Sequence, residues 1–248
     1  MDIAFKEKFT QLWSRFFGSA ELPVVFYYAD NVVDAEIVEP AQKWKCFIGE
    51  LAKVRKGRSL AYNHEAVSCG GGKKYLGFTN KLRPGFEYFL SCGNEDIEGE
   101  RYLQSPGLVE KFLANAPWAP AKGKMIVFKR WDMLLEADEP EVAVFFATPD
   151  VLSGLFTLAG FDREEMNGTI APFGSGCSSI IQYPLAECLN AKPRAVLGML
   201  DVSARTFVQE NVMSFALPVK RLEEITNYME ETFLITESWE KVRRRINK

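Results

Sequence analysis

Histidine is almost absent from this chain of 248 residues, in which His64 is the single example. That scarcity excludes a zinc site built on two histidines, and with it the HExxH helix. A Ser/His/Asp or Cys/His catalytic site would have to use His64 itself. Its setting in LAYNHEAVSC favours a loop or strand-end residue held by local hydrogen bonds, with proton transfer as the alternative.

The chain also lacks a run of apolar residues long enough to span a bilayer, and its N-terminus lacks the apolar core of a signal peptide. The net charge of −3 offers no general attraction to nucleic acid. Five cysteines, an odd number with no CxxC spacing, fit a reducing compartment in which thiols stay free. We therefore expect a cytoplasmic protein that binds neither nucleic acid nor membrane.

Strand and helix patterns alternate along the chain. Aromatic residues recur at helical spacing from Phe5 to Phe17, and Gly18 ends this first helix. Residues 23–30 (PVVFYYAD) and 141–150 (EVAVFFATPD) have the composition of strands. The alternation predicts an α/β or α+β fold, in which helices cover a mixed sheet.

Two parts of the chain follow the same order of strand, helix and glycine-flanked cysteine. Cys69 stands in SCGGGKKYLGF and Cys177 in FGSGCSSIIQYP; they follow the starts of the preceding helices, at Trp44 and Val151, by 25 and 26 residues. We expect one globular domain made of two related β-α-β halves that arose by internal duplication. The halves are expected at about 21–135 and 136–218, with C-terminal helices at 219–248, the second of them capped near Ser238.

Cys46 lies off the apolar face that we expect for its own helix. In WKCFIGELAKVRKG that face is formed by Trp44, Phe47, Ile48, Leu51 and Val54. Either something other than packing against the core holds this cysteine, or the helix is shifted by a turn or buried on two sides. The sequence leaves both readings open.

Thiolate is the only soft metal ligand and strong nucleophile that this chain carries in number. If the two halves pack their cysteine turns together, Cys46, Cys69 and Cys177 converge. Three thiolates without histidine suit an iron–sulfur cluster or Zn²⁺, with Cys92, Cys188 or an outside group as the fourth ligand. We expect a metal- or iron–sulfur-binding protein, with redox activity through the clustered thiolates and a redox partner as further expectations.

A second hypothesis makes the protein a non-enzymatic module whose pocket, between the halves, takes a small molecule or an anion. Backbone amides of the two glycine turns would then form an anion nest. The third hypothesis is a thiol enzyme with Cys69 or Cys177 as nucleophile and His64 as base. The residues expected to contact a ligand in the second hypothesis are Gly70, Gly71, Gly72, Gly174, Ser175, Gly176 and Ser178.

The ordered motifs resemble those of a known family. They are the strand PVVFYY after an N-terminal helix, the cysteine expected in a helix at Cys46, the CGGGKKYLGF turn, GERYLQSPG, the strand before TPDVLSGL and the GSGC turn followed by YP. Together they are similar to the uncharacterised ArCR family, domain of unknown function 169, from about Pro23 to Pro218. The resemblance implies recurrent cysteines at Cys46, Cys69 and Cys177, and it implies no reaction.

Overall fold

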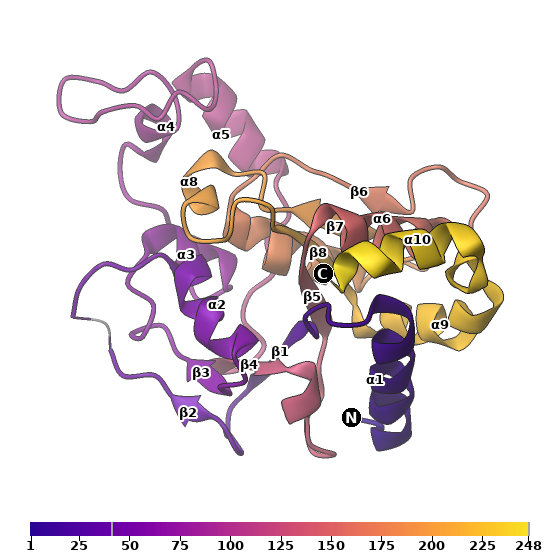
Figure 1. Ribbon diagram of the computed structural model, residues 1–248. Helices are drawn as coiled ribbons and strands as arrows, with labels where there is room; N and C mark the ends of the chain where they lie inside the picture. The colour runs from indigo at the N-terminus through magenta and orange to yellow at the C-terminus, as the bar shows by residue number, and fades with distance from the viewer. Residues whose placement is uncertain (41, 248) are drawn as a thin grey trace.

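An eight-stranded mixed sheet forms the centre of the computed structural model, which describes residues 1–40 and 42–247 (Figure 1). The strand order is β2-β3-β4-β1-β5-β8-β7-β6. The predicted α/β class and the mixed sheet are confirmed. The strands are β1 (Val24–Ala29), β2 (Glu36–Ile37), β3 (Leu60–Tyr62), β4 (Met125–Arg130), β5 (Val142–Ala147), β6 (Thr169–Ile170), β7 (Ala195–Gly198) and β8 (Met213–Pro218).

The two halves of the sheet have the same strand order, counted outward from the centre. There β1 and β5 pair antiparallel, with Val24 opposite Val144. From β1 the order is β4, β3 and β2; from β5 it is β8, β7 and β6. In each half the first two of these neighbours pair antiparallel and the outermost pair is parallel. This likeness gives each loop of one half a counterpart in the other, while the duplication itself stays a prediction.

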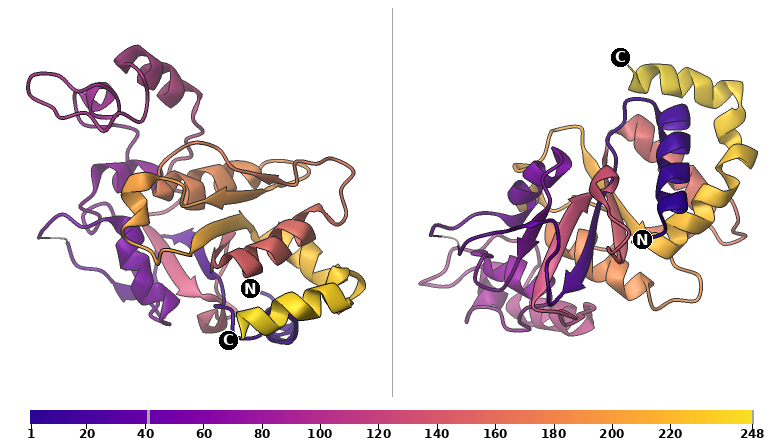
Figure 2. Two further views of the ribbon diagram at one scale, coloured as in Figure 1. Left: turned by 45° about the horizontal axis from the view of Figure 1, so that its top comes forward. Right: turned by 90° about the horizontal axis from the view of Figure 1, so that it is seen from below.

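Helices cover both faces of the sheet (Figure 2). One face carries α2 (Phe47–Arg55), α3 (Gly70–Tyr75), the π-helical turn η2 (Ser178–Gln182), α7 (Tyr183–Glu187) and α8 (Val202–Arg205). The other face carries α1 (Ile3–Phe17), α6 (Pro149–Gly160), α9 (Val219–Tyr228) and α10 (Glu237–Ile246). Because both faces are covered, all six residues of β5 are buried, and the strand reads as a continuous apolar run.

The first helix, α1, has a capping residue at each end and a stripe of buried aromatic residues. The Asp2 side chain caps α1 by accepting hydrogen bonds from the backbone of Ala4 and Phe5. Gly18 ends the helix at φ 61°, a conformation that glycine adopts without strain. The buried aromatic stripe packs on the sheet through Trp13, whose ring centroid lies 5.0 Å from that of Phe145. The predicted helix is therefore confirmed.

A lobe of two helices projects from the sheet between β3 and β4, at the upper left of Figure 1. It carries α4 (Phe86–Phe89) and α5 (Pro106–Asn115), and Ser105 caps α5. The aromatic rings of Phe112 in α5 and Phe173 lie 5.4 Å apart, so the lobe contacts the loop that precedes Cys177. Short 3₁₀ turns complete the fold at Trp131–Met133, Met229–Glu231 and Phe233–Ile235.

Three local predictions are wrong. The helix expected from Trp44 begins only at Phe47, so Trp44 is 64% exposed and does not belong to the apolar face. The glycines after Cys69 form the first turn of α3 rather than an open turn, because tertiary packing offsets their low helix propensity. The last helix is capped by Thr236 instead of Ser238; the Thr236 side chain accepts from the backbone of Trp239.

None of the helices in residues 1–40 and 42–247 combines the length and the apolar character needed to cross a membrane.

Candidate functional site

Cys46, Cys69 and Cys177 each lie at the start of a helical segment. Cys46 precedes α2 and Cys69 precedes α3, both with extended backbone. Cys177 precedes η2. Cys46 therefore lies off the apolar stripe of α2 because it stands before the helix, not within it.

The three helical starts pack against one another. A Cβ atom built on Gly72, in the first turn of α3, would lie 3.5 Å from the Cβ of Phe47, the first residue of α2. One built on Gly176, before Cys177, would lie 3.3 Å from Cγ1 of Ile48. The starts of α3 and η2 thus both contact the first turn of α2, which brings the three cysteines into one neighbourhood.

Two of the thiols in this neighbourhood, Cys46 and Cys177, have raised pKa values. Burial raises the pKa of Cys177 well above its ordinary value, and negative charge at Cys46 or Cys69 raises it further. Burial also raises the pKa of Cys46, although the nearby backbone N–H groups of Ile48 and Gly49 act in the opposite direction. At neutral pH both Cys46 and Cys177 are therefore thiols rather than thiolates.

Asp201 is a fourth acidic group beside the cysteines, and we did not predict it from the sequence. Its Oδ2 accepts a hydrogen bond of 3.0 Å from the backbone N–H of Gly176. Its Oδ1 accepts from the backbone and the hydroxyl of Ser203 at the start of α8. Its negative charge contributes to the raised pKa of Cys46 and of Cys177. The sequence signal, an aspartate capping a short helix after a strand, is common and by itself indicates only a cap.

As the side chains lie, no three or more His, Cys, Asp or Glu residues within the described ranges are grouped so that they could hold a metal ion. The packing of the helical starts brings the three cysteine-bearing segments near one another, while the role of the three cysteines as ligands stays a prediction.

A buried glutamine fixes the π-helical turn in place. The Gln182 side chain donates to the carbonyl of Tyr75 at 2.7 Å and accepts from the N–H of Ala119 at 2.6 Å. It thereby joins η2 to α3 and to the segment that returns from the lobe. Burial, followed by negative charge at Cys177, raises the pKa of Tyr75 to about 12, so this phenol stays neutral beside the thiol. Single π-helical turns occur frequently at functional sites.

Most residues expected to bind an anion already have partners. The N–H of Gly72 is directed at Sγ of Cys69, 3.5 Å away. The N–H of Gly176 is bonded to Asp201, and that of Ser178 to the Ser175 hydroxyl at 3.1 Å. Donors already bonded within the chain, beside a carboxylate, are a poor setting for an anion.

The remaining sequence candidates lie elsewhere. Cys92 is exposed in the projecting lobe. Cys188 follows α7, and burial together with the charge of Glu141 raises its pKa to about 11. His64 is half exposed, 3.5 Å from a carboxylate oxygen of Glu65. Neither Cys92, Cys188 nor His64 is among the groups that shift the pKa of Cys46 or Cys177.

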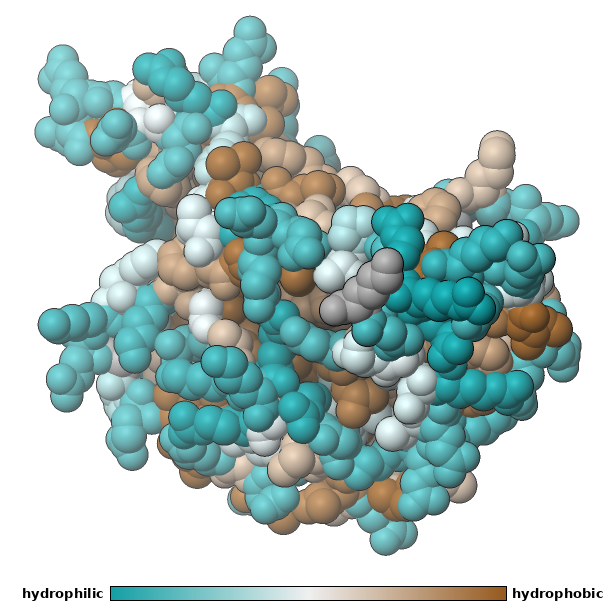
Figure 3. All heavy atoms as spheres, viewed as in Figure 1, coloured by the Kyte–Doolittle hydropathy of each residue, from teal (hydrophilic) through white to brown (hydrophobic). Residues whose placement is uncertain are grey.

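The surface beside the candidate site is apolar. Four large side chains on the segments around Cys46 and Asp201 are exposed, and the rings of Trp44 and Phe207 lie 6.3 Å apart. Apolar surface gathers below the projecting lobe, over the region of α8 (Figure 3). The four side chains are Trp44, Leu200, Val202 and Phe207.

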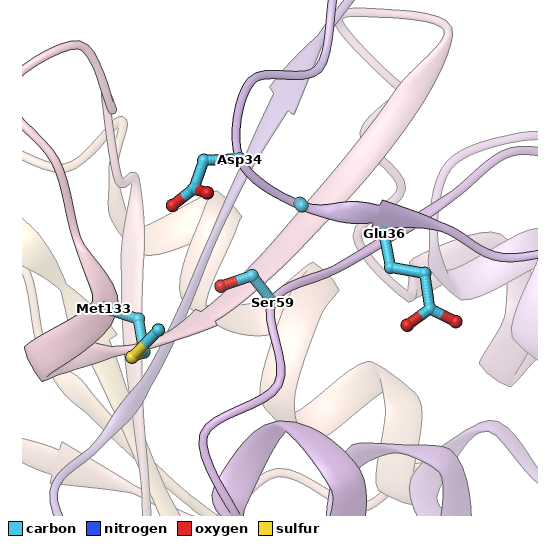
Figure 4. Close-up of a pocket in the computed structure, with 5 residues that line it drawn as sticks. Asp34, Glu36, Ser59 and Met133 are labelled. Carbon is cyan, nitrogen blue, oxygen red and sulfur yellow. The ribbon is translucent and has the colours of Figure 1, made fainter.

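Two hollows described by the structure are not lined by the cysteines. One, of about 440 Å³, opens at the β2 edge of the sheet; Figure 4 shows the side chains of Asp34, Glu36, Ser59 and Met133 around it. The other, of about 210 Å³, lies where the end of α1 meets β5, and Trp13 contributes to its wall. Neither contains a residue that we expected to bind a ligand.

Comparison with known proteins identifies a family only. The family model of domain of unknown function 169, described as uncharacterised ArCR, matches residues 17–227. The match confirms the resemblance that the sequence motifs indicated. No curated protein and no solved structure matches the chain.

Proposed function

Because this chain belongs to the uncharacterised ArCR family, which supplies no reaction, we propose a function from the arrangement of its cysteines. The thiolates of Cys46, Cys69 and Cys177 bind a soft transition-metal ion or an iron–sulfur cluster. Thiolate sulfur prefers such metals over hard cations. The protein works in a reducing, cytoplasmic setting, which keeps the three thiols free for the metal.

The observation that carries the proposal is the packing of the starts of α3 and η2 against the first turn of α2, which places three cysteines and Asp201 in one neighbourhood. Burial raises the pKa of Cys177, and negative charge at Cys46, Cys69 and Asp201 raises it further. No cation is among the groups that shift this pKa. Ionised together, these groups repel one another in a partly buried place. A bound cation removes that repulsion, and metal binding releases the thiol protons.

The surroundings support thiolate formation at one of the three positions. The backbone N–H groups of Ile48 and Gly49 lie in the first turn of α2, beside Cys46, and lower its pKa against the effect of burial. Metal binding requires the side chains to turn from the orientations seen here.

Redox activity follows if the bound group is iron or a cluster, whose potential depends on burial and on hydrogen bonds to sulfur. The exposed apolar surface around α8 supports this extension, because a redox partner needs a place to approach the centre. An anion or small-molecule module is less favoured, since the predicted donor amides are already bonded and acidic groups stand beside them.

The test is metal content after anaerobic purification. Wild-type protein should carry a stoichiometric metal, with sulfur-to-metal charge-transfer absorption if the metal is iron. Cys69→Ser should lose most of the metal. Cys92→Ser, which changes an exposed cysteine in the lobe, is the matched control and should keep it. Colourless, metal-free wild-type protein whose stability does not change in Cys69→Ser would reject the proposal.

A further inference from the structure

The exposed apolar surface around α8 reaches the start of α2. Phe207 lies over the first turn of that helix, because a Cβ atom built on Gly49 would lie 3.2 Å from Cδ1 of Phe207. Two residues further on, the Gln209 side chain accepts a hydrogen bond of 3.0 Å from Nη1 of Arg55, the last residue of α2. The segment from Phe207 to Glu210 therefore extends from the start of α2 to its end.

Two aromatic side chains form the centre of this surface. Trp44 is 64% exposed, although tryptophan is highly buried on average, and its ring lies 6.3 Å from that of Phe207. At their exposed fractions the four apolar side chains present roughly 400–500 Å² together, since a large aromatic residue alone has about 150–250 Å². Exposed apolar patches of this size mark interaction sites. A stable dimer buries about 800 Å² on each copy, so the four side chains supply about half of that area.

Charges of opposite sign lie at the two ends of α2. Lys43 and Lys45 flank Trp44 at its start, and both are exposed. Glu210 is exposed at its end, next to the residue that bonds Arg55. Because α2 has 9 residues, its ends are about 13 Å apart. Within residues 1–40 and 42–247, none of these two lysines and Glu210 belongs to an ion pair.

We propose that a second copy of this chain covers the surface, related to the first by a twofold axis that places the two α2 helices antiparallel. In such an isologous contact the same patch of each copy faces the other in reverse. The two lysines of one copy then meet Glu210 of the other, while the aromatic centres pack together. A uniformly acidic protein or an anionic membrane would instead bring negative charge against Glu210. The mixed charge therefore favours a second copy.

Dimer formation at this surface does not depend on metal binding, so it goes beyond the proposed function. A redox partner would reach the surface around α8 only in the monomer, because the second copy covers that surface in the dimer. The two associations would therefore compete.

Sedimentation velocity of the purified chain, at concentrations up to about 100 µM, tests the proposal. Wild type should sediment as a dimer. Trp44→Ser should raise the Kd of the dimer at least about tenfold, because an aromatic anchor at the centre of an interface carries much of the binding energy. Phe156→Ser is the matched control. Phe156 is 55% exposed on α6, on the opposite face of the sheet, so its replacement should leave the Kd unchanged.

A charge swap tests the antiparallel arrangement. The double change of Lys43→Glu and Lys45→Glu should raise the Kd at least about tenfold, because like charges then face each other, and so should Glu210→Lys. All three changes together should restore dimer formation, since each facing pair again has opposite charges. These side chains are exposed, so the swap also decides the question if circular dichroism shows that Trp44→Ser is unfolded.

Three results would overturn the proposal. The first is wild-type protein that stays monomeric at about 100 µM. The second is a dimer that folded Trp44→Ser leaves intact, or that the combined charge changes do not restore. The third is monomeric protein that sediments with phosphatidylglycerol vesicles through Trp44, which would assign the surface to a membrane.

Discussion

The backbone N–H of Gly176 donates to Oδ2 of Asp201 at 3.0 Å, so the residue before Cys177 is tied to the start of α8. Gly176 also faces α2, and the space for a side chain there is already filled. This one residue thereby sets the spacing between two cysteine-bearing segments. Its replacement tests whether that spacing matters.

Gly176→Ala should destabilise the protein by about 1–3 kcal/mol, the usual cost of overpacking. The new methyl group would lie 2.8 Å from the Cβ of Ala204 and 3.2 Å from Cε of Met199, so the neighbours must move. Metal retention should fall as well, because Cys177 shifts relative to Cys46. Gly70→Ala is the control: it adds a methyl group next to Cys69 with no atom within 4 Å. Equal metal content and stability in the two variants would contradict the packing described for Gly176.

Lys129→Met should destabilise the protein by about 3–5 kcal/mol, measured by urea unfolding, because it leaves a buried carboxylate unpaired. Lys129 is fully buried, and its Nζ lies 3.0 Å from both carboxylate oxygens of Asp138. The matched control is Lys122→Met, which breaks the pair between Lys122 and Glu141. Lys122 is exposed, so the loss should stay below about 1 kcal/mol. Similar losses in the two variants would show that the Lys129 pair is not buried in solution.

Gln182→Leu should cost about 1–3 kcal/mol, because it leaves the N–H of Ala119 and the carbonyl of Tyr75 without their buried partner. The lobe should also open more often, since its return segment is bonded to Gln182. Hydrogen exchange measures this as faster labelling of residues 79–118. Tyr183→Phe, which removes an exposed bond to Phe173, should leave that exchange unchanged. Unchanged exchange in Gln182→Leu as well would mean that something else anchors the lobe.

Alkylation of Cys188 should be slow at pH 7 and should accelerate about tenfold per pH unit up to about pH 10. Its pKa is raised to about 11, first by burial and then by the charge of Glu141, so the reactive thiolate is a small fraction throughout that range. Below the pKa, each unit of pH multiplies the thiolate fraction by about ten. Mass spectrometry of peptides labelled with iodoacetamide measures the rate. A rate at Cys188 that is independent of pH between 7 and 9 would contradict this environment.

The elements with dense local patterns could be predicted from the sequence. The aromatic stripe predicts α1 and the apolar run predicts β5, because the residues of each pattern are buried along its whole length. The glycines of α3 could not be read as helix. Their helix depends on neighbours distant in sequence, such as Phe47, against which Gly72 packs.

The correspondence between the halves was predicted wrongly for a topological reason. The outer strands β2 and β6 have two residues each and leave no sequence signal. The helix after β5, α6, lies on the opposite face from α2 and has no helical counterpart between β1 and β2. Matching α6 to α2 therefore paired Cys69 with Cys177. Asp201 stayed hidden because only the strand order sets it, after β7, against Cys69, after β3.

X-ray absorption at the metal edge of anaerobically purified protein tests the central claim most directly. Three thiolate ligands predict a shell of about three sulfur atoms at about 2.3 Å from a zinc-class ion. In Cys69→Ser the sulfur shell should weaken, while in Cys92→Ser it should not. A bound metal with no sulfur shell, or the same shell in Cys69→Ser as in the wild type, would contradict a centre built on Cys46, Cys69 and Cys177.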